Sequence, residues 1–108
     1  MAELESVTDA TFQEKVLNSE LPVLVAIGAA WAEPWNKLKP VIKEIAVERA
    51  GTLTVLALDI DTNPDIAGTL QVRGVPTLFF FKQGKQVGTL VGSIEKSKIN
   101  VLISRHLP

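Results

Sequence analysis

The sequence predicts a single α/β domain spanning residues 1–108, with the element order βαβαβαββα. Two observations predict this class. First, apolar residues follow two patterns in turn: the unbroken or alternating runs typical of strands, and the three- and four-residue spacings typical of helices. Second, 46% of the 108 residues are hydrophobic and 21% are charged, and no repeat or low-complexity stretch separates the segments. This length and composition are typical of one globular domain.

The first elements are a short strand, a helix and a buried strand. Residues Leu4–Val7 predict the short strand, and Thr8 or Asp9 is placed to cap the helix that follows. The apolar residues of this helix, at helical spacing, are Phe12, Val16 and Leu17. The continuous apolar run Val23–Ile27 predicts a strand covered on both faces, as in the centre of a sheet with parallel members.

The longest predicted helix covers residues 34–49, where apolar residues repeat at three and four positions. Pro34 suits the first turn, whereas Pro40 lies inside the pattern and should kink the helix. A second buried strand is expected over Thr52–Ile60.

The last part of the chain predicts a short helix, a hairpin and a final helix. Asn63 should cap the short helix, which covers 64–70 and has a proline in its first turn. Strands over Pro76–Phe81 and Gln86–Val91, joined by a turn at 83–84, predict the antiparallel hairpin. The apolar residues of the final helix are Ile99, Leu102, Ile103 and Leu107.

Composition and charge argue against several classes of protein. Eleven basic and twelve acidic residues give a net charge of -1 with no basic block, so nucleic-acid binding has no support. The start of the chain carries Glu3 and Glu5 where a signal peptide would have basic residues, and no apolar run approaches the ~18 residues of a membrane span. The expected location is cytoplasmic, with no membrane contact.

No cofactor or metal site is expected. The sequence has no cysteine, and its single histidine, His106, is expected to lie at the surface. The acidic spacing at Asp59, Asp61, Asn63 and Asp65 is that with which a calcium loop begins. Pro64 and Leu70 occupy the positions of the required glycine and glutamate, so we interpret this segment as a strand end leading into a helix cap.

Several motifs together resemble the thioredoxin family. They are the element order, the run 22–29, Pro40, Asp59-Ile60-Asp61 with Asn63-Pro64, Gly74-Val75-Pro76-Thr77, and Gly92. The resemblance covers essentially the whole chain and is strongest to bacterial and chloroplast m-type thioredoxins. It implies a thioredoxin fold: three α/β/α layers with a central mixed sheet of about five strands and four helices.

The chain departs from this family at the redox motif. Thioredoxins reduce disulfides with a Trp-Cys-Gly-Pro-Cys motif, and the resemblance places Trp31 and Pro34 on matching residues but Ala32 and Trp35 on the two cysteines. Disulfide exchange needs a thiolate, so the resemblance implies no catalytic residue and no reductase activity. The buried acid and the nearby lysine of the family are also replaced, by Ala26 and Ala57.

A second departure concerns side-chain volume. The family usually carries an aromatic residue at the position of Gly28, and this chain instead has one at Trp35. We interpret the pair as an exchange in which the indole occupies the space left free at Gly28, because close-packed interiors tolerate swaps that keep total volume. The alternative is an outward-facing Trp35.

The resemblance also implies a shallow apolar groove around the motif, with a cis peptide bond between Val75 and Pro76. The groove residues are Trp31, Glu33, Pro34, Ile60, Gly74, Val75, Pro76, Gly92 and Ser93. Trp31 is expected to contact a ligand rather than to belong to the core. Below, this surface is called the Trp31–Pro76 groove.

Three hypotheses of function follow. The leading one is a redox-inactive thioredoxin-like monomer that binds a partner protein or extended peptide through the Trp31–Pro76 groove, as a binding or assembly module. The alternative is a silenced or engineered variant of a protein-disulfide oxidoreductase that retains only substrate recognition. The third is a structural redesign of the fold without a function.

Overall fold

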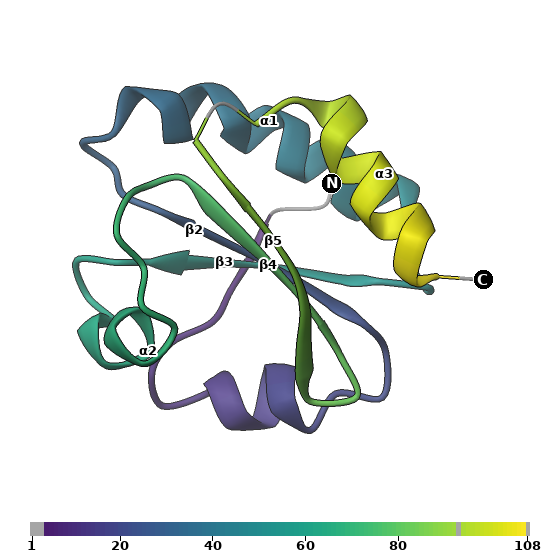
Figure 1. Cartoon of the computed structure of the whole chain (residues 1–108). Helices are drawn as coiled ribbons and strands as arrows, with labels where there is room; N and C mark the ends of the chain where they lie inside the picture. The colour runs from purple at the N-terminus through teal and green to yellow at the C-terminus, as the bar shows by residue number, and fades with distance from the viewer. Residues whose placement is uncertain (1–3, 93, 108) are drawn as a thin grey trace.

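A computed structural model describes residues 4–92 and 94–107, which form a five-stranded mixed sheet between two layers of helices (Figure 1). The strand order is β1-β3-β2-β4-β5, with β1, β2 and β3 parallel and β4 and β5 antiparallel to their neighbours. The strands are β1 (Glu5–Ser6), β2 (Val23–Gly28), β3 (Thr54–Asp59), β4 (Thr77–Lys82) and β5 (Lys85–Val91). The helices are the π-helical turn η1 (Gln13–Leu17), α1 (Glu33–Glu48), α2 (Pro64–Thr69) and α3 (Lys96–His106). The predicted element order is confirmed, with strand ends that differ by one or two residues.

Strand β2 is central, as its continuous apolar run predicts, and all of its residues are buried. Successive side chains of a strand point to opposite faces of the sheet. Leu24 and Ala26 therefore pack in the cluster that α1 and α3 cover, while Val23, Val25 and Ile27 pack in the cluster on the side of η1 and α2. Figure 1 shows the two helix layers on opposite sides of the sheet.

Helix α1 buries one face on the sheet through Trp35, Leu38, Ile42 and Ile45. Pro40 lies inside the helix, which continues through it from Glu33 to Glu48. Proline lacks an amide hydrogen, so the Asn36 carbonyl has no partner four residues later in the helix. Helix α3 is tied to α1 because Lys96 Nζ lies 2.8 Å from Glu48 and 3.3 Å from Glu44. The hydrogen bond to Glu48 is the largest cause of the raised pKa of Lys96.

The N-terminal helix differs from the expected α-helix. The Asn18 amide donates to the Gln13 carbonyl at 2.9 Å, five residues back, so the segment is a π-helical turn. This wider turn buries Phe12 and Val16 but leaves Leu17 38% exposed, which corrects the prediction that Leu17 belongs to the buried face.

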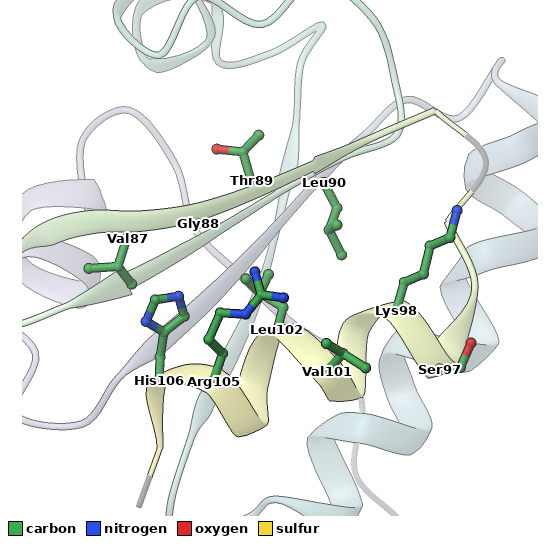
Figure 2. A pocket seen from close by; sticks show the side chains of 10 residues that line it. All are labelled: Val87, Gly88, Thr89, Leu90, Ser97, Lys98, Val101, Leu102, Arg105 and His106. Carbon is green, nitrogen blue, oxygen red and sulfur yellow. The ribbon is translucent and has the colours of Figure 1, made fainter.

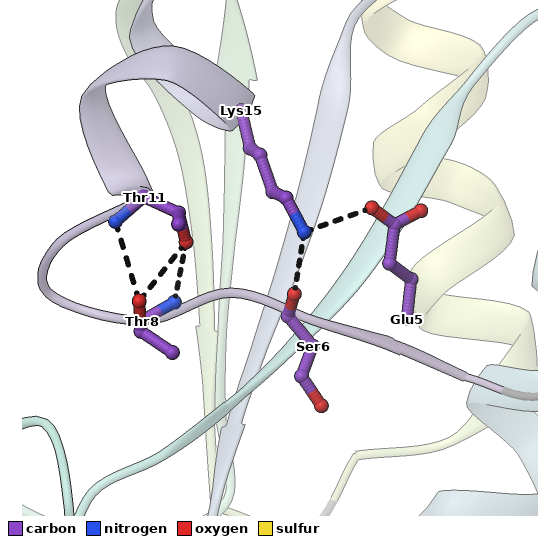
Figure 3. A network of polar contacts seen from close by, with 5 residues as sticks. All are labelled: Glu5, Ser6, Thr8, Thr11 and Lys15. Atoms are coloured by element: carbon purple, nitrogen blue, oxygen red, sulfur yellow. Dashed lines mark hydrogen bonds and ion pairs between the residues drawn. The ribbon is translucent and has the colours of Figure 1, made fainter.

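Polar contacts fix the segment before this turn (Figure 3). Thr8 and Thr11 exchange amide-to-hydroxyl hydrogen bonds of 2.9 and 3.2 Å, which close the turn before η1. The N-cap position is Phe12 and no side chain caps the turn, so the prediction of Thr8 or Asp9 as its cap is wrong. Lys15 Nζ reaches back to the Ser6 carbonyl at 3.2 Å and to the Glu5 carboxylate at 3.1 Å. These contacts tie the turn to the short strand β1, which pairs with β3.

The cap of α2 comes from a residue distant in sequence. Asp9, which the sequence suggested as a cap for the first helix, accepts hydrogen bonds from the amides of Asp65 at 3.1 Å and Ile66 at 2.9 Å. Asn63 occupies the N-cap position but makes no side-chain cap bond, so its prediction as the capping side chain is wrong. Its Oδ1 instead accepts from the Asp9 amide at 2.8 Å, and its Nδ2 donates to the Asp59 carbonyl.

The hairpin of β4 and β5 turns at Gln83 and Gly84, both with positive φ, of 53° and 77°. Positive φ at both central positions matches the right-handed twist of the flanking strands. Behind this hairpin, His106 stacks on Phe80 with ring centroids 5.6 Å apart, so it is half-buried and the prediction of a surface histidine needs correction. Leu107 lies just beyond the end of α3 as its C-cap residue.

In the described part of the chain, no helix combines the length and the apolar composition that crossing a membrane requires.

Candidate functional site

Four loops meet at one end of the sheet. Strands β2 and β3 are parallel and end side by side, with Gly28 opposite Asp59. Strand β4 starts at this end, where Thr77 faces Ile27, and β5 finishes there, where Val91 faces Thr77. The loops after β2, β3 and β5 and the loop before β4 are therefore neighbours, and they carry all the predicted groove residues except those at the start of α1.

The turn from β2 into α1 carries Trp31 and Ala32. The Ala32 amide donates to the Ala29 carbonyl at 3.0 Å, and the Asn36 side chain donates to the Ala30 carbonyl at 3.1 Å. These bonds close the turn tightly in front of the helix. Ala32 is buried, whereas Trp31 is 70% exposed.

The exposed indole of Trp31 is held in place by the loop after β3. Its Nε1–H donates to Oδ2 of Asp61 at 2.8 Å. The Asp61 amide in turn donates to the Asp59 carboxylate at 2.9 Å, and the Ile60 amide donates to the Gly28 carbonyl at 3.0 Å. Trp31 thus presents a large apolar surface to solvent in a fixed orientation, and it lies outside the core as expected.

The loop before β4 contains the cis peptide bond between Val75 and Pro76. The Thr77 hydroxyl donates to the Gly74 carbonyl at 2.7 Å and closes this loop. Pro76 is buried, Val75 is half-buried and Gly74 is exposed.

Three predicted groove residues from three separate segments line one hollow of about 220 Å³: Pro34, Pro76 and Gly92. We call it the proline hollow. Apolar side chains of Leu38, Val41 and Ile94 complete its wall, and Lys37 and Glu95 lie at its rim. An apolar hollow with a few charged groups around it has the character of a protein or peptide contact site.

The remaining groove residues take different positions. Ile60 and Val75 are half-buried and pack against both core clusters. Glu33 is exposed in the first turn of α1 and lies 3.6 Å from Lys37. Ser93 lies outside the described residues. The structure therefore brings Pro34, Pro76 and Gly92 into one hollow, and it links Trp31 to the β3 loop instead.

Trp35 is buried, with 6% of its surface exposed. A Cβ atom built on Gly28 would overlap the indole ring of Trp35, so the ring lies directly on this glycine. The predicted burial of Trp35 against Gly28 is confirmed. Ala57, at the position of the family's lysine, lines a hollow of about 270 Å³ beside the same indole, and Ala26 is fully buried.

The chemistry open to this site is limited. The sequence contains no cysteine, and a methyl group at Ala32 or an indole at Trp35 neither attacks a disulfide nor leaves from one. Within residues 4–92 and 94–107, no cluster of three or more potential metal ligands occurs.

Comparison with known proteins decides the family. The family model for thioredoxin matches residues 3–105. The chain belongs to the thioredoxin family. It is 37% identical to thioredoxin 1 of Nostoc sp. over 107 residues, which cover 99% of this chain and all of that protein. It is 48% identical to thioredoxin of Mycobacterium tuberculosis over 102 residues, or 94% of this chain and 88% of that one.

The five-stranded mixed sheet is accordingly that of the thioredoxin fold, and the chain is an atypical family member without cysteine. Its Trp31, Pro34 and Pro76 occupy the same end of the sheet as the altered motif positions Ala32 and Trp35. Ala32 and Trp35 are both buried, so the motif change lies beneath the residues predicted for the groove.

Sequence reasoning missed Asp61 as a residue of this surface. The acidic segment around it is interpreted from the sequence as a strand end leading into a helix cap and as one motif of the family resemblance, with no contact to Trp31 expected. One signal could have identified it: Asp61 follows the strand whose end lies beside the Trp31 turn, which brings its carboxylate within reach of the indole N–H. Leu38, Val41 and Ile94 were missed because the wall of a hollow depends on how α1 and the loop after β5 pack.

Proposed function

We propose that this chain is a redox-inactive thioredoxin-family protein that binds a partner protein or an extended peptide through the Trp31–Pro76 groove. It acts as a binding or assembly module, and it is not a catalyst. The observation that carries the proposal is the Trp31 indole, which is 70% exposed and yet fixed by its hydrogen bond to Asp61. Tryptophan is one of the side chains enriched among the few residues that dominate binding at protein interfaces.

The surroundings of Trp31 support the same function. The proline hollow gives the surface an apolar depression, and the loop before β4 places the exposed Gly74 next to the half-buried Val75. A partner side chain in the hollow and a partner backbone along this loop would together match the way in which extended peptides bind. We further propose that the protein works as a monomer in the cytoplasm, which sedimentation and cell fractionation test respectively.

The experiment is capture of partners from the lysate of the source organism, followed by titration calorimetry with the purified partner. Trp31→Ala removes the exposed indole, and Val75→Asp places a charge on the groove. Val47→Asp is the matched control, because Val47 is exposed on α1 away from the groove. We expect the two groove variants to weaken binding by about tenfold or more, as at interface hot spots, and the control to bind normally.

Equal binding by all four proteins would contradict the proposal. The thermal unfolding midpoint of each variant is measured alongside, so that a loss of folding by Val75→Asp is separated from a loss of binding.

A further inference from the structure

Strand β5 forms one edge of the sheet. It pairs with β4 on one side, and within residues 4–92 and 94–107 no strand pairs with its other side. An unpaired edge presents backbone N–H and C=O groups to solvent, which is a template for pairing with another chain. This edge runs along the side of the sheet and meets the Trp31–Pro76 groove only at its last residue, Val91, which precedes Gly92.

The regular part of this edge is short and well defined. Phe81 faces Gln86 and Phe80 faces Gly88, so Val87 is left without a partner and forms a bulge. From Gly88 to Val91 the pairing with β4 is regular. Bulges limit edge pairing, so an added strand has about four residues of β5 available, Gly88–Val91.

Hollows lie on both faces of this four-residue edge. On the α3 side, a hollow of about 450 Å³ is lined by Leu90 of β5 and by Val101 and Leu102 of α3. On the opposite side, a hollow of about 330 Å³ is lined by Thr89 and Val91 together with Arg73. Val91 and Val101 remain 65% and 55% exposed. Figure 2 shows Leu90 pointing toward α3 and Thr89 pointing away from it.

Two hollows on opposite faces of an edge match the geometry of an added strand. Alternate side chains of a strand point to opposite faces of the sheet. A peptide paired with Gly88–Val91 would therefore place one set of side chains over Leu90 and Val101, and the other set toward Arg73. The backbone would supply affinity, and the two hollows would select the side chains.

The charge around both hollows has one sign. Lys98 and Arg105 line the hollow on the α3 side, and Figure 2 shows the Arg105 guanidinium reaching from α3 toward β5. Arg73 lines the other hollow. In the described part of the chain none of these three cations forms an ion pair, and no aspartate or glutamate lines either hollow.

The positive charge beside the β5 edge indicates which kind of chain would bind there. Two copies of the chain meeting through β5 would bring like charges together, which disfavours a second copy. In a strand that alternates acidic and apolar side chains, all carboxylates lie on one face, and the α3 side, which has two of the three cations, favours them there. We propose that the β5 edge is a second docking site, which binds an extended segment of a partner protein in which acidic and apolar side chains alternate.

The test is a titration of the ¹⁵N-labelled protein with a fluorescein-labelled heptapeptide that alternates Glu and Val. NMR locates the site, and fluorescence anisotropy gives the Kd. We expect amide shifts at Gly88–Val91 and along α3. We expect the charge reversals Lys98→Glu and Arg105→Glu together to raise the Kd by about tenfold, because both rim attractions become repulsions.

Three controls make the test specific. Lys43→Glu reverses a charge on the outer face of α1 and should leave the Kd unchanged. A peptide that alternates Lys and Val should bind at least tenfold more weakly than the Glu peptide. The Glu peptide N-methylated at every residue should lose binding, because it has no N–H group left to donate to the edge.

Absence of shifts at β5, or a Kd that the double charge reversal does not change, would overturn the inference. Shifts at Trp31 and Ile60 in place of those at β5 would do so as well, since they would assign the peptide to the Trp31–Pro76 groove. Concentration-dependent shifts at β5 without peptide would point to a second copy instead. Trp31→Ala should leave peptide binding at β5 intact. An experiment that refutes the β5 site therefore does not refute partner binding at the Trp31–Pro76 groove, and the two proposals are tested separately.

Discussion

The Trp35 indole and the missing side chain of Gly28 form one packing unit. The ring occupies the space into which a Cβ atom on Gly28 would project, and it is nearly fully buried. Because protein interiors are close-packed, neither position can change size without the other. The resemblance to thioredoxins places a thiol at this position, and in this chain an aromatic ring stands there as part of the core.

Replacing Trp35 should cost much of the stability of the protein. Trp35→Ala removes a buried indole, for which we expect a loss of about 3–5 kcal/mol in urea unfolding. Gly28→Trp in the natural background should also destabilise, because the two rings overlap. In the Trp35→Ala background, however, Gly28→Trp should restore part of the loss by refilling the cavity. Simple additivity of the two changes would show that they do not share one space.

The bond between Trp31 and Asp61 should govern orientation more than stability. Asp61→Ala removes an exposed hydrogen bond, so the free energy of unfolding should fall by less than about 1 kcal/mol. The indole N–H resonance of Trp31 should move toward the position of a water-exposed indole, and partner binding should weaken about fivefold. Asp65→Ala, an exposed acid outside this contact, is the control. An unchanged indole resonance in Asp61→Ala would contradict the assigned contact.

At the scale of the elements, the first segment and α2 are coupled through Asp9. The Asp9 carboxylate accepts two of the free amides at the start of α2, while its own amide donates to Asn63. A helix of six residues has little stability of its own, so such a cap matters for it. The N-terminal segment therefore helps to build the loop that carries Asp61.

Removing this cap should loosen α2 selectively. Asp9→Ala should lower the free energy of unfolding by about 1–2 kcal/mol, the cost of losing an N-cap, and should speed hydrogen exchange at the Asp65 and Ile66 amides. Asp9→Asn keeps one acceptor oxygen and should have a smaller effect. Exchange rates at Asp65 and Ile66 that do not respond to Asp9→Ala would contradict the capping role.

The sequence predicts those elements whose structure is determined by residues close together in the chain. The apolar run of β2 and the spacing of Trp35 and Leu38 determine a central strand and an amphipathic helix, and both are observed. The spacing of Phe12 and Val16 is compatible with an α-helix and with a π-helical turn, so the residues alone did not distinguish them. The cap from Asp9 to α2 joins residues more than fifty positions apart, which no local pattern encodes.

The same distinction holds for the candidate site. Pro34, Pro76 and Gly92 could be assigned to one surface because a family resemblance supplied their spatial relation. The contact of Trp31 with Asp61 and the wall of the proline hollow depend on how loops that are distant in sequence pack together. No local sequence pattern predicts this packing. The hollows beside β5 were missed for this reason as well.

For the whole molecule, the thioredoxin fold collects the changed and the retained residues at one end of the sheet. The changes at Ala32, Trp35 and Gly28 lie under the surface that Trp31 and Pro76 present. Buried charges are costly unless they are paired or used, so replacement of the family's acid and lysine by Ala26 and Ala57 fits a site that no longer moves protons. We interpret the site as rebuilt for binding.

The most direct test is to restore both cysteines and measure insulin reduction driven by dithiothreitol. The variant carries Ala32→Cys and Trp35→Cys, and the same variant with Gly28→Trp refills the space that the indole leaves. We predict that both variants reduce insulin at less than about a tenth of the rate of Nostoc thioredoxin 1, since the surrounding site is rebuilt and the buried acid is absent. The second variant should be the more stable of the two. Reduction at a rate comparable to that of Nostoc thioredoxin 1 would contradict a site rebuilt for binding. It would show that the loss of the two thiols alone had abolished the reductase activity.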